Sequence, residues 1–213
     1  MHRIIRLFIY IIVLSSPITC IGETFQYQIK SVDIDTTTQI TITTDLEKHH
    51  IYETQAYQHH WECDLDFNTQ VWRYHHNKET SHLTVTRDQN KLHIIGKYRG
   101  KEVDMTYPID DRPWYQFIDV YIPKPLQTTD AHSFWYLRSR DLKPIKLQLR
   151  YNKHETVSIN NTMYALDRYQ LTVSKWPAFL WRIHYWINPD TTVLMKKQLY
   201  TNPKIDMIYK EIP

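Results

Sequence analysis

Apolar and polar side chains alternate along most of this chain with a period of two residues. Between residues 60 and 67, apolar side chains at odd positions alternate with histidine and acidic side chains at even positions. The same alternation recurs in residues 25–30, 38–43, 83–86, 103–107, 145–151 and 169–173. Alternation is typical of strands that bury one face in antiparallel sheets, whereas strands of parallel sheets read as continuous apolar runs. The sequence therefore predicts a mainly β, antiparallel fold.

Short polar segments separate the predicted strands. They are found at residues 88–90, 99–101, 151–153, 160–161 and 188–190. The chain has only three glycines, so asparagine and aspartate are expected to supply most of the turn positions that need a positive φ angle.

One short helix is expected near residues 111–121. Asp111 is a good N-cap, and Pro113 suits the first turn of a helix. Pro123 and Pro125 would end the helix, since proline cannot continue it. In this interpretation Asp110 and Asp111 cap the helix and interact favourably with its dipole.

The first 22 residues have the order of a secretory signal peptide. Arg3 and Arg6 precede an apolar run over residues 7–14, and small or polar residues follow up to Gly22. The apolar run is too short for a permanent membrane span. We therefore predict a signal peptide at 1–22, a single antiparallel β domain at 23–213, and a periplasmic or secreted location. An uncleaved anchor and a lipid-anchored Cys20 are the alternatives.

Charge and cysteine content narrow the function further. The chain has 26 basic and 23 acidic residues, and loss of Arg3 and Arg6 would leave a net charge near +1 with no basic block. Nucleic acid is therefore not an expected partner. Cys63 would be the only cysteine of the mature chain, which excludes an internal disulfide. Since Cys63 lies on the apolar side of its strand, we expect an inert, buried thiol.

The second half of the chain carries an order of motifs found in a known group of proteins. The motifs are Asp-Arg-Pro-Trp-Tyr-Gln at 111–116, Phe-Trp-Tyr-Leu at 134–137, His-Glu-Thr-Val-Ser-Ile at 154–159, and an aromatic strand followed by Asn-Pro-Asp at 181–190. Over roughly residues 110–200 the chain resembles uncharacterised bacterial envelope proteins, of the domain-of-unknown-function type, that share the lipoprotein-carrier (LolA/LolB-like) fold. It departs from them at Asn160-Asn161, where they often have glycine, and it lacks their glycine-rich opening strand pair.

The resemblance implies a single curved antiparallel sheet, a half-barrel, folded over a hydrophobic interior in the bacterial periplasm or at the outer membrane. It implies no catalytic residue. The expected function is that of an exported, non-enzymatic envelope protein that binds a hydrophobic ligand or lipid under the sheet, with no cofactor and no permanent transmembrane span. The alternatives are a protein–protein interaction module of the envelope and a metal-dependent hydrolase.

Aromatic side chains are the candidates for lining an apolar cavity. The segment 176–181 is strongly apolar at a place where a turn between strands is expected, so it either packs into the core or contacts an apolar ligand. The full set of candidate ligand-binding residues is Trp114, Tyr115, Trp135, Tyr136, Trp176, Phe179, Trp181 and Trp186.

The hydrolase alternative rests on histidines and acids in the first half. His60, Glu62 and Asp64 share one polar face of a predicted strand, and His50 or His76 could join them from neighbouring strands. The other interpretation is a solvated polar face, and no familiar metal-binding motif is present. The chain also lacks a Gly-x-Ser-x-Gly motif that would identify a nucleophilic serine.

Overall fold

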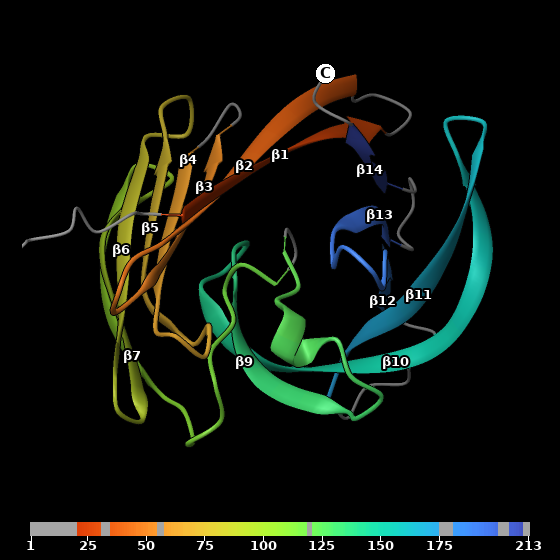
Figure 1. Cartoon of the computed structure of the whole chain (residues 1–213). Helices are drawn as coiled ribbons and strands as arrows, with labels where there is room; N and C mark the ends of the chain where they lie inside the picture. The colour runs from red at the N-terminus through yellow and green to blue at the C-terminus, as the bar shows by residue number, and fades with distance from the viewer. Residues whose placement is uncertain are drawn as a thin grey trace, which may run out of the picture.

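The protein is a single, strongly curved antiparallel sheet (Figure 1). The computed structural model describes residues 21–30, 35–54, 58–118, 121–174, 181–199 and 205–210. The fourteen strands are β1 (Ile21–Lys30), β2 (Asp35–Thr44), β3 (His49–Thr54), β4 (Gln58–Cys63), β5 (Thr69–His76), β6 (Ser81–Asp88), β7 (Lys91–Tyr98), β8 (Lys101–Pro108), β9 (His132–Arg138), β10 (Lys143–Ile159), β11 (Thr162–Val173), β12 (Arg182–Ile187), β13 (Leu194–Leu199) and β14 (Ile205–Lys210). The predicted fold class is confirmed.

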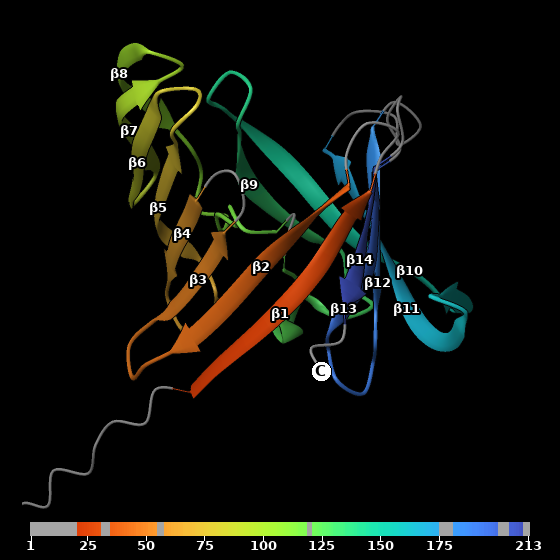
Figure 2. The same ribbon diagram turned by 90° about the horizontal axis from the view of Figure 1, so that it is seen from above.

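The sheet consists of two meanders joined at one seam. Strands β1 to β8 follow one another outward from the middle of the sheet, and β9 to β14 return from the other edge, so that β14 pairs with β1. We call β1–β8 the N-terminal meander and β9–β14 the C-terminal meander. The long strands β1 and β2 run between the two sides of the molecule (Figure 2). The connection between β8 and β9 lies inside the curve of the sheet (Figure 1).

The predicted helix near 111–121 is wrong. The described residues of this segment contain no α-helix, and the one helical element found in the described chain is a short 3-10 turn, η1 (Lys124–Leu126). Trp114 instead forms a parallel bridge with Trp135 of β9. Trp135 N donates to Pro113 O at 2.8 Å, and Tyr115 N donates to Trp135 O at 3.1 Å. Because β9 occupies these backbone groups, helix capping at Asp111 does not determine the local structure.

Gln116 extends this contact between the two meanders. Its side-chain oxygen accepts a hydrogen bond from Leu137 N at 2.8 Å, and its side-chain nitrogen donates to Leu137 O at 2.9 Å. On the other side, Thr69 N of β5 donates to Trp114 O at 2.7 Å. The segment therefore covers the edge of β9 and links it to the start of β5, which removes an exposed strand edge.

The main core fills the concave face of the sheet and includes residues of both meanders. Its largest fully buried side chains are Trp61, Trp72, Trp114, Tyr27, Tyr185, Phe117 and Phe134. Cys63 is buried among them, as predicted. Burial raises the pKa of the Cys63 thiol, so the thiolate needed for nucleophilic chemistry is disfavoured.

A second, smaller cluster lies on the opposite face of the C-terminal meander. It is formed by Ile159, Leu166, Trp186 and Met195. Strand β12 is consequently buried on both faces, with Tyr185 in the main core and Trp186 in the second cluster. Strands β10 and β11 are the longest hairpin, with 17 and 12 residues, and they curl strongly (Figure 1). At its tip Asn160 and Asn161 have φ angles of 49° and 67°, as the shortage of glycine predicts.

The N-terminal predictions are largely outside the described residues. Of the predicted signal peptide 1–22, only Ile21 and Gly22 are described, and both belong to β1. Cys20 is not among the described residues. Within the described ranges, no helix is long and apolar enough to cross a membrane.

Candidate functional site

A cavity of about 410 Å³ opens on the core face at the β9–β10 end of the sheet. It is lined by Tyr136, Arg138, Ser139, Arg140, Ile145, Val173 and Trp181, and we call it the apolar mouth. Strand pairing explains its position. Tyr136 pairs with Ile145, and one step further along the same face Phe134 pairs with Leu147 of the main core. The mouth is therefore an opening at the rim of the core.

The walls of the apolar mouth are hydrophobic and its rim is basic. Tyr136, Ile145, Val173 and Trp181 all pack against the main core. At the rim, Arg138 forms an ion pair with Asp141, which raises the pKa of Arg138 and lowers that of Asp141. Arg140 forms no salt bridge within the described chain. An apolar hollow beside a cationic side chain without an ion-pair partner suits an anionic amphiphile.

The rim also connects the two meanders. The hydroxyl of Tyr98, at the end of β7, donates a hydrogen bond to the backbone oxygen of Ser139. Burial raises the pKa of Tyr98, which keeps this hydroxyl protonated as a donor. The position of the turn between β9 and β10 thus depends on both halves of the sheet.

Of the eight predicted aromatic residues, the structure describes six, and these, including Trp135, described below, lie in four places. Trp114 and Tyr115 are buried in the main core, and Trp186 is buried in the second cluster. Tyr136 and Trp181 meet at the apolar mouth. Trp176 and Phe179 lie outside the described residues.

Trp135 belongs to a polar cluster around Asp110. The indole nitrogen donates to Asp110 Oδ1 at 2.7 Å, and Lys146 Nζ lies 2.7 Å from Asp110 Oδ2. The hydrogen bonds from Lys146 and Trp135 lower the pKa of Asp110 to about 2. Asp110 therefore does not cap a helix, contrary to the prediction, and instead joins β9 and β10 to the connecting segment.

A second hollow, of about 640 Å³, lies across β3 to β7. Two rows of cross-strand neighbours line it. One row is Tyr52, His60, Arg73, Thr84 and Ile95, and the other is Thr54, Gln58, His75 and His82. Since side chains alternate between faces, both rows stand on the face opposite to the main core. The row between them, which includes His59 and Gly96, forms the floor. We call this hollow the polar-face groove.

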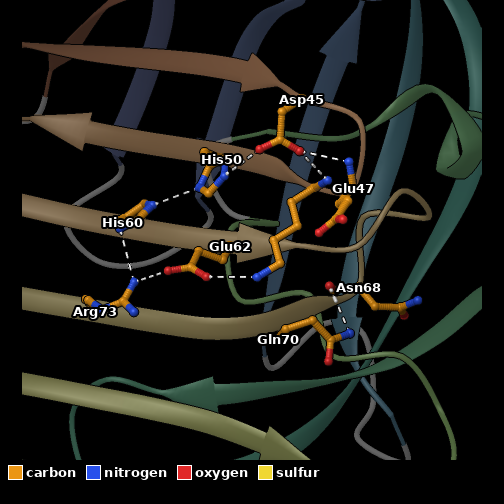
Figure 3. A network of polar contacts seen from close by, with 9 residues as sticks. Asp45, Glu47, His50, His60, Glu62, Asn68, Gln70 and Arg73 are labelled. Carbon is orange, nitrogen blue, oxygen red and sulfur yellow. Dashed lines mark hydrogen bonds and ion pairs between the residues drawn. The ribbon is translucent and has the colours of Figure 1, made fainter. Parts of the chain in front are cut away.

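A network of charged groups and histidines borders the groove (Figure 3). His50 Nδ1 lies 3.3 Å from His60 Nε2, and His50 Nε2 lies 3.4 Å from Asp45 Oδ2. Glu62 forms ion pairs with Arg73 and, at 3.5 Å, with Lys48. Burial lowers the pKa of His60. Burial alone would raise the pKa of Glu62, but the hydrogen bond and charge of Arg73 outweigh it and lower the pKa.

The predicted histidine and acid cluster is therefore assembled only in part. His50, His60 and Glu62 come together, but Asp64 accepts hydrogen bonds from Asp66 N and Asn68 N and organises the turn after β4. His76 lies elsewhere, where it accepts a hydrogen bond from Glu79 N. Among the described residues, no three His, Cys, Asp or Glu side chains are grouped to hold a metal ion.

Comparison with known proteins gives the fold. No protein-family model matches the chain, and no curated protein is similar to it in sequence. A crystal structure of a β-barrel-like protein of domain of unknown function DUF1849 from Brucella abortus superposes with a TM-score of 0.59 at 8% identity, covering 89% of this chain and 95% of that one. The fold is β-barrel-like. The hypothetical lipoprotein YmcC from Escherichia coli matches with a TM-score of 0.36 at 11% identity, over 89% of this chain and 85% of that one.

The likeness to the Brucella protein agrees with the broader part of the resemblance noted in the sequence, a curved antiparallel sheet. The specific relation to LolA and LolB stays a prediction. Ile145, Arg138 and Arg140 at the apolar mouth could not be identified from the sequence pattern, and neither could Tyr52, His75 and His82 in the polar-face groove. Only the register of neighbouring strands brings these residues together, so a correct pairing of strands was the signal needed to find them.

Proposed function

We propose that this protein is an exported, non-enzymatic envelope protein that binds a hydrophobic or amphiphilic small molecule at the apolar mouth. The observation that carries the proposal is the opening of this hollow onto the main core, with Tyr136, Ile145 and Trp181 as its walls. Removal of apolar surface from water contributes about 25 cal/mol per Å². A volume of 410 Å³ lies within the ordinary range for ligand pockets.

The rim favours a ligand with an anionic head. Arg140 forms no salt bridge within the described chain, although its charge also acts on Asp141, whereas Arg138 is held by Asp141 directly. A carboxylate or phosphate near Arg140 would gain a charge-assisted hydrogen bond, while the attached apolar chain enters the mouth. Fatty acids and anionic lipids have this chemistry. Export through the predicted signal peptide 1–22, to the periplasm or the outside of the cell, would bring the protein into contact with such lipids.

The test is a titration of the full chain with a fluorescent fatty acid and with its alcohol analogue. We expect the Ile145→Asp variant to bind the fatty acid at least about tenfold more weakly, a loss of about 1.4 kcal/mol. Ile95→Asp makes the same change at an exposed position in the polar-face groove and is expected to bind normally. Arg140→Ala should weaken binding of the acid but not of the alcohol.

Two results would contradict the proposal. One is the absence of saturable binding by the purified protein. The other is equal binding by Ile145→Asp and Ile95→Asp, provided that both variants retain the thermal unfolding midpoint of the parent. Native mass spectrometry of the protein from the cell envelope would identify a retained lipid by its mass, and would also read the N-terminal residue.

A further inference from the structure

The polar-face groove has the dimensions of a site for an extended ligand. It crosses five strands, β3 to β7. Neighbouring strands lie about 4.8 Å apart, so the groove is about 19 Å long. Its two side-chain rows are two residues apart along each strand, a separation of about 7 Å. The groove is thus long and narrow, unlike the apolar mouth.

The floor of the groove is held flat at Gly96. This residue has a φ angle of 129°, and a Cβ atom there would lie 2.2 Å from the backbone oxygen of His82. Only glycine permits this close approach of β7 to β6. The exposed side chain of Ile95 stands beside it as one end of the groove.

An aromatic platform forms the other end. The ring of Tyr52 is stacked on the imidazole of His60, with centroids 4.3 Å apart and planes 6° apart. His60 is in turn held by His50 and Arg73. Tyr52 is 39% exposed, although a stacked neighbour fixes its ring. A rigid, accessible ring of this kind offers an apolar surface at little cost in conformational entropy.

Between the two ends, the groove offers hydrogen-bonding groups that are not used within the described chain. Gln58, His82 and Thr84 make no side-chain hydrogen bond there, and His75 uses one ring nitrogen, at 2.6 Å from Asn77 Oδ1. Amide, imidazole, hydroxyl and guanidinium groups together recognise hydroxyl and carboxylate groups.

Acidic side chains are scarce in the groove. The one carboxylate among its lining residues is Glu53, which is 5% exposed and accepts a hydrogen bond from Thr38. Arg73 brings a fixed positive charge, and within the described chain it uses only Nη1, for Glu62 and His60, which leaves Nε and Nη2 to donate to a ligand. The groove therefore favours a ligand with few, widely spaced negative charges over a neutral or a densely charged one.

We propose that the polar-face groove binds a short acidic oligosaccharide. The apolar face of one sugar ring would pack on the part of the Tyr52 ring that His60 leaves open, and its neighbours would place hydroxyl groups toward Gln58, His82 and Thr84. A sugar carboxylate would lie near Arg73. A polyphosphate or nucleic acid would need a row of unpaired cations along the groove, and the nearby Lys48 and Arg73 are both bound to Glu62.

The test is calorimetric titration of the full chain with galacturonic acid oligomers, with galactose oligomers of the same length, and with inorganic polyphosphate. We expect saturable binding of the acidic oligomers and weaker binding of the neutral ones. Tyr52→Ala should weaken binding about tenfold, in line with the loss of a stacked ring and its buried area. His82→Ala, at an exposed position, should give a smaller loss. Leu65→Ala, which removes an exposed apolar side chain outside the groove, should bind like the parent protein.

The proposal is overturned by any of three results: no binding of the acidic oligomers, equal binding of the neutral oligomers, or tighter binding of polyphosphate. It is also overturned if His82→Ala and Tyr52→Ala both bind like Leu65→Ala. Thermal unfolding followed by circular dichroism shows whether each variant is folded. If Tyr52→Ala is not folded, His82→Ala provides the test of the groove. Fatty acid binding at the apolar mouth is on the other face of the sheet, so the two proposals fail independently.

Discussion

The N-terminal and C-terminal meanders bury their strands differently. In the N-terminal meander, strands such as β6 alternate between buried and accessible residues, and the accessible face carries the polar-face groove. In the C-terminal meander, β12 is buried at five of its six positions, because the second cluster covers its other face. The sheet thus buries one face in the N-terminal meander and both faces in part of the C-terminal meander. Hydrophobic alternation therefore depends on whether one or both faces of a strand are buried, and not on how the strand pairs with its neighbours.

The largest effect should come from breaking the connection between the two meanders. Trp114 is fully buried, its indole nitrogen donates to Gln116 at 2.9 Å, and its backbone contacts both β9 and β5. We expect Trp114→Ala to lower the free energy of unfolding by about 3–5 kcal/mol, since it opens a large cavity in the main core. Urea unfolding measures this loss. Trp114→Phe, which retains most of the volume, should cost much less, and equal losses would show that packing is not the cause.

A pair of variants on β11 compares its two faces directly. Leu171 lies in the main core and Leu166 in the second cluster, and each is at most 1% exposed. We expect Leu171→Ala to cost about 3–4 kcal/mol and Leu166→Ala about 2 kcal/mol, because a small cluster can collapse more easily around a cavity. If Leu166→Ala has no effect in urea unfolding, the second cluster does not stabilise the fold.

Acid should destabilise the protein through His59. Burial beside Trp61 and Trp72 lowers the pKa of His59 to about 3, and its Nδ1 accepts a hydrogen bond from Trp72 at 3.0 Å. Since the unfolded chain takes up this proton near the ordinary pKa of about 6.5, it binds more protons than the folded protein between these two values. The free energy of unfolding is therefore greatest above pH 6.5 and falls as the pH decreases toward 3.

We expect His59 to contribute a loss of about 2 kcal/mol between pH 6.5 and 4, after allowance for solvent near the ring. Urea unfolding at several pH values measures it. His59→Gln keeps an acceptor for Trp72 and should flatten the pH dependence by this amount. Burial also lowers the pKa of His184, to about 4. The contribution of His184 to the pH dependence of the free energy of unfolding should remain in the His59→Gln variant. If the free energy of unfolding depends on pH in the same way in the parent and in His59→Gln, His59 is excluded as a cause of the acid destabilisation.

The smallest effects should come from single polar side-chain contacts, one in each meander. Glu155, in the C-terminal meander, accepts a hydrogen bond from the indole nitrogen of Trp186 at 3.0 Å and forms ion pairs with Lys153 and Arg168. Glu155→Gln should cost about 1–2 kcal/mol, since Trp186 is buried and Arg168 is partly buried. His93 forms an exposed pair with Asp104 in the N-terminal meander, and His93→Ala should cost less than about 0.5 kcal/mol. A larger cost for His93→Ala would contradict the view of its face as fully solvated.

Much of the fold could be predicted from the sequence because alternation is a local signal. It gave the antiparallel class, and the shortage of glycine indicated asparagine at the β10–β11 turn. Gln89 and Arg99, however, also adopt positive φ angles at turns, where only the closure of the hairpin selects that conformation. The error at residues 111–121 has the same origin. Good helix signals at Asp111 and Pro113 were overridden by backbone pairing with β9, a contact between distant parts of the chain.

The candidate sites were less predictable than the fold. Aromatic content identified Tyr136 and Trp181, but it equally selected Trp114 and Trp186, which are buried in two different clusters. The alternation correctly placed His60 and Glu62 on one face, together with His50. The alternation could not show that the Asp64 side chain accepts hydrogen bonds within a turn. Composition identifies side chains that can bind, whereas strand register decides which of them meet.

The pairing of β1 with β14 has a consequence for biosynthesis. During synthesis β1 emerges before β14, yet each is the other's neighbour in the middle of the sheet. Until β14 emerges, one side of β1 has no partner strand, and β13 is in the same position. The nascent protein therefore carries two unpaired strand edges until β14 is made. Unpaired edges can pair with other chains, so premature termination before β14 is expected to favour aggregation.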